Sequence, residues 1–241
     1  MTDPVRPSPA ATIVLLRDRA PGSVEVLLLQ RHGKSKFAAG DHVFAGGKVE
    51  RVGGLVDEAR LDAGLTAEAA AATLGGGLEG RDALAYWVGA IREAFEEAGL
   101  LLAHTADGDL VRFTGPARDR FAAHRAACQT SDEAFFAMLR AESLRLATDC
   151  LTYFAHWITP EENPIRFDTR FFAAVAPADQ EATVDGHEIV ASRWLTPDEA
   201  LEAARRQEIS LRAPTSKNLE LVARAGASGT PRWPASSAKN R

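Results

Sequence analysis

The sequence has few of the residues on which several common kinds of protein depend. Its 241 residues include only two cysteines, Cys128 and Cys150, which form no close pair and therefore predict neither a disulfide framework nor a zinc motif. No run of 18 apolar residues occurs, so no membrane-spanning helix is expected. Residues 1–11 contain three prolines and no apolar run, so a secretory signal is not expected either. These absences predict a cytoplasmic protein with reduced thiols.

Basic runs and several familiar enzyme motifs are also missing. The formal net charge is -5 and the sequence pI is about 5.7, so nucleic acid is not an expected partner. No Walker A, G-x-G-x-x-G or G-x-S-x-G pattern is present, and no two of the six histidines have H-x-x-x-H spacing. An anionic substrate would therefore need a bound metal ion or a few arginines to hold it.

The order of local patterns predicts an α/β protein. Hydrophobic residues make up 46% and charged residues 25% of the chain, which is ordinary for one globular domain of this length. We expect that domain at residues 10–225, with an Ala- and Gly-rich insert at about 51–80, a helical segment at about 115–147 and a loose tail at 226–241. Strands are expected at 12–16, 24–30, 42–45, 151–158, 166–175 and 188–195, and helices at 66–73, 82–98, 117–127, 131–147 and from Thr196 onward.

The clearest helix is expected at residues 82–98. Asp82 is a suitable N-cap residue, and Gly99 is suited to the left-handed position that ends a helix. One apolar face is formed by residues spaced at i, i+4, i+7 and i+11, namely Leu84, Val88, Ile91 and Phe95.

Three carboxylates lie near the end of this expected helix. Glu93, Glu96 and Glu97 are three and four positions apart, so they share one patch of the helix surface. Like charges repel, and a helix C-terminus disfavours negative charge, so the patch costs stability unless a cation binds there. Oxygen ligands without nearby cysteine favour Mg²⁺ or Mn²⁺. Arg92 can hold one of the carboxylates with two hydrogen bonds and fix its orientation.

The alternative is an ordinary acidic helix face in contact with solvent. For two glutamates alone that alternative would be preferred. Here five identities occur together, from Arg92 to Gly99, and such a pattern is expected by chance with a probability on the order of 10⁻⁴ in a chain of this length.

The pattern Arg-Glu-x-x-Glu-Glu-x-Gly resembles the second half of the Nudix box. Residues 44–50, Phe-Ala-Gly-Gly-Lys-Val-Glu, are similar to its first half, and residues 192–200 are similar to the strand-to-helix junction near the end of many Nudix domains. The resemblance implies the Nudix hydrolase superfamily and an α/β/α sandwich with a mixed sheet, here carrying a helical insertion.

The sequence departs from the compact Nudix box in two ways. The 45 positions from Gly47 to Arg92 exceed the usual spacing by some thirty residues. The glutamate usual at mid-box falls on Leu84, with Glu79 and Asp82 as nearby carboxylates. The long insert, together with residues 37–47, 156–160 and 166–172, resembles the branch that includes peroxisomal coenzyme A diphosphatases. Because the last residues are Lys-Asn-Arg, a cytoplasmic location is expected instead of a peroxisomal one.

The resemblance also implies roles for individual residues. Glu93, Glu96 and Glu97 are expected to bind Mg²⁺ or Mn²⁺, and the backbone of Gly46 and Gly47 to approach the ion and the substrate. Arg31 and Arg166 are expected to contact phosphates, since guanidinium groups match their geometry. The expected catalytic residues are Arg92, Glu96, Glu97 and, as general base, Glu188, with Asp185 as the other candidate base.

The predicted activity is metal-dependent hydrolysis of a diphosphate bond in a nucleoside diphosphate derivative, with coenzyme A or acyl-CoA as the favoured substrate. Hydrolysis of ADP-ribose, NADH or other nucleotides is an alternative, and so is a non-catalytic nucleotide-sensing module of the same fold. The expected partner is a small diphosphate molecule, not nucleic acid or a membrane, and a homodimer is compatible with the sequence.

Overall fold

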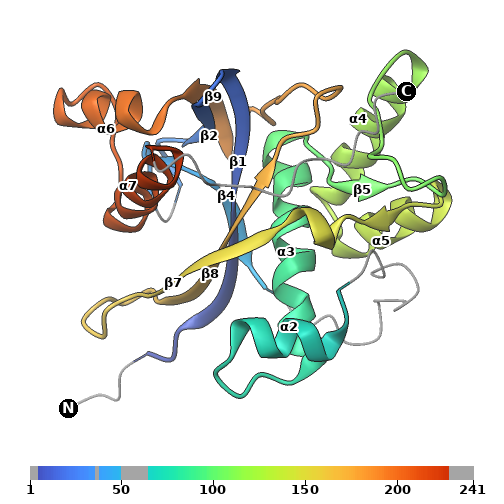
Figure 1. The fold of residues 1–241 in the computed structure, drawn as a ribbon, viewed down its shortest axis with the longest axis horizontal. Helices are drawn as coiled ribbons and strands as arrows, with labels where there is room; N and C mark the ends of the chain where they lie inside the picture. The colour runs from blue at the N-terminus through green and yellow to red at the C-terminus, as the bar shows by residue number, and fades with distance from the viewer. Residues whose placement is uncertain (1–4, 36–37, 50–64, 228–241) are drawn as a thin grey trace.

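The computed structural model describes residues 5–35, 38–49 and 65–227, with a seven-stranded mixed sheet at the centre (Figure 1). The strand order is β3-β2-β1-β8-β7, with β4 paired to β1 and β9 paired to β2. β1 and β8 are parallel and the other pairs are antiparallel. The strands are β1 (Ser8–Ala20), β2 (Ser23–Arg31), β3 (His42–Val43), β4 (Ala45–Lys48), β7 (Thr152–Ile158), β8 (Phe167–Val175) and β9 (Ile189–Leu195).

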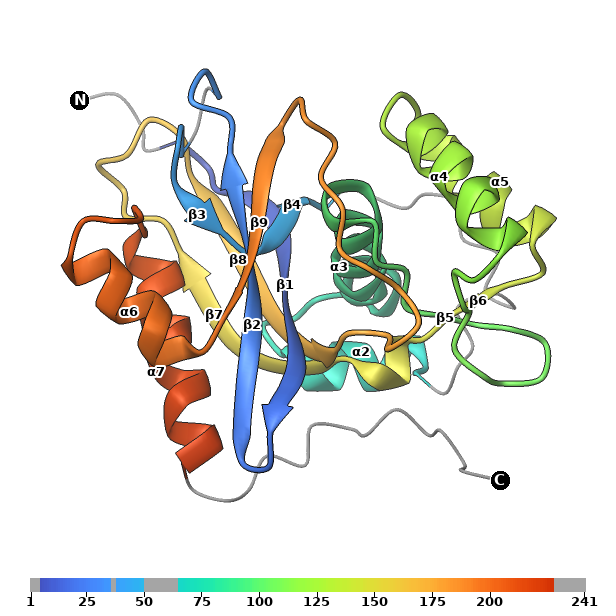
Figure 2. The same ribbon diagram turned by 90° about the horizontal axis from the view of Figure 1, so that it is seen from above.

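Helices cover both faces of this sheet (Figure 2). One face carries α2 (Ala67–Leu74), α3 (Gly80–Ala98), α4 (Pro116–Cys128) and α5 (Asp132–Ala141), and the other carries α6 (Pro197–Arg205) and α7 (Ala213–Ala227). A two-stranded ribbon of β5 (Ala103–His104) and β6 (Arg145–Leu146), followed by the 3₁₀ turn η1 (Thr148–Cys150), lies beside α4 and α5. The predicted α/β/α sandwich with a mixed sheet is confirmed.

The two central strands have continuous apolar runs because both of their faces are buried. In β1, Ile13 and Leu15 point into the core under α3, whereas Val14 and Leu16 point into the core under α6 and α7. These alternating side chains fix the register of the sheet, since a shift by one residue would exchange the two cores.

The predicted helix at 82–98 is α3, which begins two residues earlier with Glu79 at its N-cap position. Gly99 has the expected left-handed conformation, with φ of 69°. The predicted apolar face is buried, but so is nearly every residue from Ala83 to Ile91, because β1, β4 and α2 pack around this part of the helix.

Helix α2 lies within the predicted insert, with Thr66 at its N-cap position and Gly75 at its C-cap position. It packs on α3 and buries Ala70 and Leu74 in the same core. The described part of the insert therefore contributes Ala70 and Leu74 to the core through α2. Residues 51–64 lie outside the described part of the chain.

The predicted helix at 131–147 is too long. α5 ends at Ala141, where Ser143 takes a positive φ of 54° and the Leu144 amide donates to the Leu139 carbonyl. The chain then enters β6 instead of continuing the helix.

Two other boundaries also differ from the sequence-based prediction. The single strand expected at 42–45 is divided into β3 and β4, which pair with different strands, β2 and β1. At the other end, α7 was not predicted and extends through Gly226 and Ala227 of the expected tail; residues 228–241 lie outside the described part.

The helix start expected at Thr196 is confirmed as a capping box at the beginning of α6. The Thr196 hydroxyl accepts from the Glu199 amide, and the Glu199 carboxylate accepts from the Thr196 amide. Among the helices in the described residues, none is both long and apolar enough to cross a bilayer.

Candidate active site

The site forms where β1 changes its antiparallel partner. The N-terminal half of β1, at Ala10 to Ile13, pairs with β4, whereas the half from Leu16 to Ala20 pairs with β2. Helix α3 packs on β1 and β4, so its last turns lie over the Gly46-Gly47 pair.

Two glutamates of α3 contact this glycine pair directly. The Gly46 amide donates to Glu97 Oε2 at 3.0 Å. The Glu93 carboxylate lies so close to Gly47 that a Cβ atom on that residue would be 2.5 Å from Glu93 Oε1. Gly46 cannot carry a side chain either, because its Cβ would be 2.7 Å from the Ala11 carbonyl oxygen. The two predicted halves of the box therefore meet in space despite the long sequence between them.

Arg92 contacts two of the glutamates, whereas the sequence-based expectation was a pair of hydrogen bonds to one carboxylate. It donates to Glu93 Oε1 at 2.8 Å and to Glu96 Oε2 at 3.0 Å. A further hydrogen bond, 3.2 Å long, reaches the Lys48 carbonyl at the end of β4. One guanidinium group thus ties two glutamates of α3 to the strand that carries the glycines.

The electrostatics of the site favour a bound cation. Burial raises the pKa of Glu97 well above its ordinary value, and the negative charge of Glu93 raises it further, while the Gly46 amide and Arg31 oppose the shift. Burying two neighbouring carboxylates costs free energy when no cation is bound to them. Carboxylate oxygens are the ligands that Mg²⁺ and Mn²⁺ prefer. Glu93, Glu96 and Glu97 therefore fit a hard divalent ion by their chemistry and by the close approach of backbone at Gly47.

Arg31 and Glu188 join the same cluster from other elements. Arg31, the last residue of β2, lies 3.6 Å from Glu97 Oε1 and donates a hydrogen bond to Glu188 Oε1. The negative charge of Glu188 also contributes to the raised pKa of Glu97. The Glu188 side chain is half exposed, so it can reach a molecule that enters from solvent.

The two candidate bases have different surroundings. Asp185 Oδ1 accepts from the amides of His187, Glu188 and Ile189 at 2.7–3.0 Å and thereby shapes the turn before β9. Asp185 holds the loop, and Glu188 is the member of that loop that faces the carboxylate cluster. The assignment of Glu188 as general base stays a prediction.

The family follows from a match over most of the chain. Residues 65–221 match a family model described as the NUDT19 Nudix domain. The chain belongs to the NUDT19 Nudix domain family.

Individual relatives agree with this membership. The chain is 28% identical over 219 residues, 79% of its length, to a Xenopus laevis protein named acyl-coenzyme A diphosphatase NUDT19. It is 32% identical over 251 aligned positions, 85% of its length, to the Gallus gallus protein of the same name. The chain spans 57% and 65% of the lengths of these two relatives.

A solved structure supports the fold independently. The crystal structure of a NUDIX hydrolase from Alicyclobacillus acidocaldarius is 28% identical in sequence and superposes with a TM-score of 0.71. The match covers 92% of this chain and 96% of that one. The Nudix fold therefore accounts for nearly the whole chain.

Sequence reasoning missed one residue that supports the site of this Nudix domain. Arg125 of α4 is buried and donates to the carbonyls of Glu96, at 3.0 Å, and Glu97, at 2.9 Å, and to Thr183 Oγ1 at 2.8 Å. Gln129 adds a 3.1 Å hydrogen bond to the Glu96 carbonyl. These donors satisfy C-terminal carbonyls of α3, and Arg125 places positive charge at the negative end of that helix.

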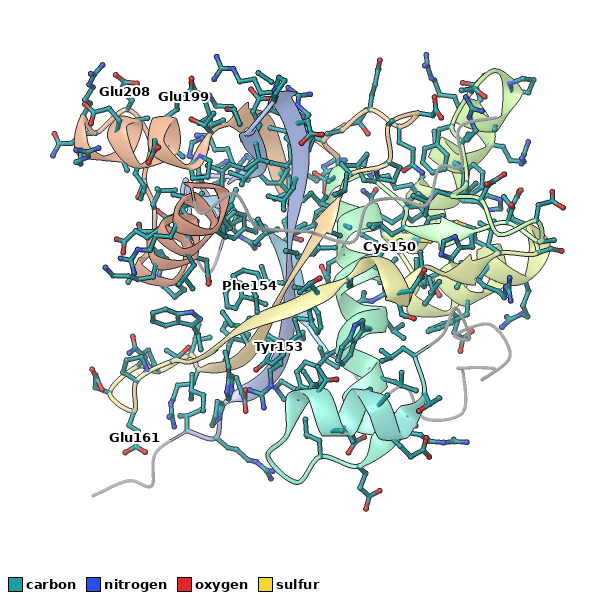
Figure 3. The ribbon with its side chains drawn as sticks, in the orientation of Figure 1. Cys150, Tyr153, Phe154, Glu161, Glu199 and Glu208 are labelled. Atoms are coloured by element: carbon teal, nitrogen blue, oxygen red, sulfur yellow. The ribbon has the colours of Figure 1, made fainter. Side chains whose placement is uncertain are left out.

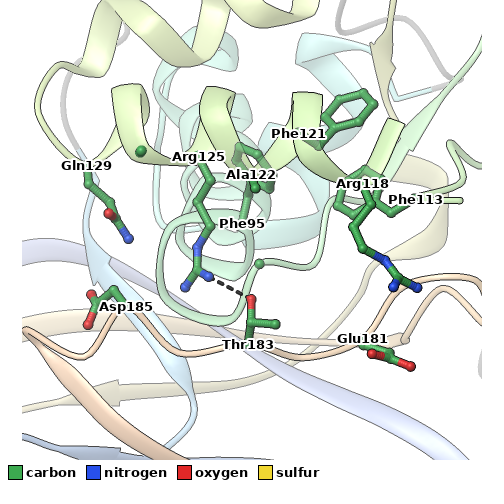
Figure 4. Close-up of a pocket in the computed structure, with 12 residues that line it drawn as sticks. Phe95, Phe113, Arg118, Phe121, Ala122, Arg125, Gln129, Glu181, Thr183 and Asp185 are labelled. Carbon is green, nitrogen blue, oxygen red and sulfur yellow. Dashed lines mark hydrogen bonds between the residues drawn. The ribbon is translucent and has the colours of Figure 1, made fainter. Parts of the chain in front are cut away.

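No local pattern marks Arg125 as special, because its partners lie in α3 and before β9. Burial lowers its pKa, and the charges of Asp185 and Glu97 oppose this shift. A cavity of about 220 Å³ lies beside Arg125, at the end of α3 (Figure 4). Phe95, Phe113 and Phe121 supply its apolar wall, and Arg118 and Asp185 lie on opposite sides of it.

Two other sequence expectations lie away from this cluster. Arg166, expected to contact phosphate, is buried at the start of β8 and donates to the carbonyls of Thr159 and Val5. The structure does not place Arg166 near the carboxylates, and both of these hydrogen bonds stabilise the backbone. At the mid-box position Leu84 is buried in the core, and Glu79 is the N-cap residue of α3.

The two glycines of β4 are expected to respond differently to alanine. Gly47→Ala should leave the free energy of unfolding nearly unchanged, since only the flexible end of Glu93 must move, but it should raise the metal concentration needed for half-maximal activity. Gly46→Ala should lower stability by about 1–3 kcal/mol, because its Cβ meets the backbone of β1. Urea unfolding and metal titration of activity measure both effects, and equal stability losses would contradict this geometry.

Proposed function

We propose that this Nudix domain hydrolyses the diphosphate bond of coenzyme A or an acyl-CoA with Mg²⁺ or Mn²⁺ as cofactor. The observation that carries the proposal is the buried pair of Glu93 and Glu97 on the Gly46-Gly47 backbone. Arg92 and Arg31 offset part of the charge of this pair, but the pKa of Glu97 stays raised beside them, so a divalent ion would stabilise the two carboxylates further. A diphosphate substrate also needs a cation to neutralise its charge.

Glu93, Glu96 and Glu97 would hold the ion. When bound, the ion supplies charge neutralisation of the diphosphate and a more acidic water molecule. Arg92 keeps Glu93 and Glu96 in place, and the Gly46 amide keeps Glu97 Oε2 in place. This pre-organisation matters because positioning and electrostatics contribute most to phosphoryl transfer.

Two further residues act on substrate and water in this proposal. Arg31 binds a phosphate oxygen with the guanidinium edge that now contacts Glu188. Glu188 accepts the proton of the attacking water, since its half-exposed carboxylate lies on the solvent side of the cluster. The bond that breaks is the phosphoanhydride, and water supplies the oxygen and both protons of the two products.

The substrate assignment is supported by the relatives, both of which are named acyl-coenzyme A diphosphatases at 28% and 32% identity. The sequence also resembles the Nudix branch that includes peroxisomal coenzyme A diphosphatases, and the match to the NUDT19 Nudix domain agrees with that resemblance. We also propose that the Nudix domain spans residues 10–225.

A substrate panel tests the proposal. CoA, acetyl-CoA, a long-chain acyl-CoA, ADP-ribose, NADH and dNTPs are incubated with the protein and Mg²⁺ or Mn²⁺, and products are separated by chromatography. We expect CoA to yield 3′,5′-ADP and phosphopantetheine, with kcat/KM at least tenfold above those of ADP-ribose and NADH. Removal of the metal with EDTA should abolish turnover, and added Mg²⁺ or Mn²⁺ should restore it.

The other outcomes separate the alternatives. Preferred hydrolysis of ADP-ribose or NADH would keep the diphosphatase chemistry and reject the CoA assignment. Saturable nucleotide binding without turnover of any compound would instead establish a sensing module.

A further inference from the structure

A second group of ligand-type side chains lies outside the carboxylate site. His104 of β5 and Asp149 and Cys150 of η1 place one imidazole nitrogen, one carboxylate oxygen and one sulfur within 4.8 Å of one another. His104 Nε2 and Asp149 Oδ1 are 2.9 Å apart. Figure 3 shows Cys150 between the end of α5 and β7, away from the Gly46-Gly47 pair on β4.

Two buried polar atoms at this place have no hydrogen-bond partner within the described chain. They are His104 Nδ1 and the Thr148 hydroxyl, and both residues are more than nine-tenths buried. Thr148 belongs to the same 3₁₀ turn as Asp149 and Cys150. Unsatisfied buried polar atoms are rare in folded proteins, and each one calls for a specific explanation.

We propose that His104, Asp149 and Cys150 form a Zn²⁺ site that closes the base of the helical segment at residues 105–147. Zn²⁺ is bound by thiolate, imidazole and carboxylate ligands in tetrahedral geometry. Bond lengths of roughly 2.0–2.3 Å place such ligand atoms roughly 3.3–3.6 Å apart. To reach that spacing the His104 and Asp149 atoms, now 2.9 Å apart, would separate slightly, and the more distant atoms of the cluster, now within 4.8 Å, would move closer. A water molecule supplies the fourth ligand.

The spacing patterns by which zinc motifs are found in a sequence do not apply to this arrangement. They concern closely spaced Cys and His residues, whereas His104 lies 45 positions before Asp149. Strand pairing brings them together: Ala103 pairs with Leu146, His104 pairs with Arg145, and the Ala147 amide donates to the Leu102 carbonyl.

The identity of the metal follows from the ligand chemistry. The carboxylate site of α3 offers oxygen ligands only, which suit Mg²⁺ or Mn²⁺, whereas a thiolate and an imidazole select a softer ion. Access from solvent is provided by Asp149, whose side chain is 45% exposed, while His104 is buried behind it. The two sites therefore bind different ions from the same solution.

The location gives the proposed ion a structural role. His104 directly precedes the segment that contains α4 and α5, and Asp149 and Cys150 follow it. That segment carries Arg125 and Gln129, which cap the metal-binding helix. A Zn²⁺ ion at its base fixes the platform from which those two side chains reach α3.

A Cys-His-Asp nucleophile is the alternative use of these three residues. A catalytic cysteine needs a hydrogen bond from its thiol to the imidazole that takes its proton. Here His104 Nε2 contacts Asp149 Oδ1, and His104 Nδ1 has no hydrogen-bond partner within the described chain, so the geometry favours a metal ligand over a catalytic cysteine.

Cobalt spectroscopy tests the site without any measurement of activity. Metal-free full-length protein in excess Mg²⁺ is titrated with Co²⁺, and the thiolate-to-cobalt charge-transfer absorption is recorded. We expect one equivalent of Co²⁺ to produce the absorption and one equivalent of Zn²⁺ to displace it. Cys150→Ser and His104→Ala should lose the signal, whereas Cys128→Ser and Glu97→Gln should retain it.

Cys128→Ser is the matched control, because Cys128 is the other cysteine of the chain and lies near the carboxylate site. Absence of the charge-transfer signal in the wild-type protein, or its loss in Cys128→Ser alone, would overturn the proposal. If Cys150→Ser fails to fold, alkylation of the wild-type protein decides the matter. Zn²⁺ should then slow modification of Cys150 at least tenfold, and an unchanged rate would reject the site.

Discussion

Glu97→Gln is expected to lower kcat by more than about a hundredfold while the protein stays folded. Loss of groups that only support a metal ligand typically costs 10- to 100-fold, so loss of a ligand itself should cost more. Glutamine keeps the shape of the side chain and an oxygen for the Gly46 amide, but it removes the negative charge that would hold the ion. Turnover of CoA at saturating Mg²⁺, with circular dichroism as a check of folding, measures this effect.

The stability of this variant distinguishes a metal site from an ordinary acidic helix face. In metal-free buffer the raised pKa of Glu97 means that the folded protein binds a proton more tightly than the unfolded chain. Wild-type stability should therefore fall as pH rises above the ordinary carboxyl pKa, and this slope should be weaker in Glu97→Gln. Added Mg²⁺ should raise the Tm of the wild-type protein and not that of the variant.

Glu202→Gln on α6 is the matched control, because it makes the same chemical change on the opposite face of the sheet. It should retain activity and the Mg²⁺-dependent rise in Tm. Wild-type activity in Glu97→Gln, or loss of activity in both variants, would remove Glu97 from the set of metal ligands.

Arg125→Met is expected to lower the free energy of unfolding by about 3 kcal/mol and to reduce kcat as well. The substitution fills similar space but leaves the carbonyls of Glu96 and Glu97 without their charged donor at a buried helix end. Leaving such groups unsatisfied is costly, and the last turn of α3 carries Glu96 and Glu97, two of the three glutamates that we propose as metal ligands. Urea unfolding and steady-state kinetics measure the two effects.

Arg118→Met provides the control, since Arg118 is an exposed residue of the same helix beside the same cavity. Its stability should change by less than about 0.5 kcal/mol. Arg125→Lys should lie between the two, because lysine keeps the charge and loses the planar arrangement of donors. Equal losses in Arg118→Met and Arg125→Met would show that the hydrogen bonds to α3 contribute little.

Much of the fold could be predicted because its patterns are local. The continuous apolar run of β1, the apolar face of α3 and the capping box at Thr196 depend on residues a few positions apart. The end of α5 could not be predicted, since it depends on a positive φ at Ser143 and on the pairing of β6 with β5. Likewise, the division of residues 42–48 between two partners follows from sheet topology and not from composition.

The site also contains residues that could be predicted from the sequence and residues that could not. The three glutamates and Arg92 lie on consecutive helical turns, so their proximity followed from spacing alone. The resemblance indicated the glycine pair, and the structure places it against Glu93 and Glu97. Arg125 was missed because the residues of α3 that it contacts are 28 and 29 positions away in the sequence. Arg166 was wrongly expected to bind phosphate, because the sequence does not distinguish such an arginine from one that donates to backbone carbonyls.

The exchange of partners along β1 also bears on how such enzymes diverge. The glycine pair and the carboxylate helix are aligned by hydrogen bonds and packing on a shared strand, so the connection between them is not required to set their distance. Selection on catalysis therefore leaves the length of that connection free. Relatives with the same chemistry will then share residues across an interval of variable length, and a pattern of fixed spacing will overlook them.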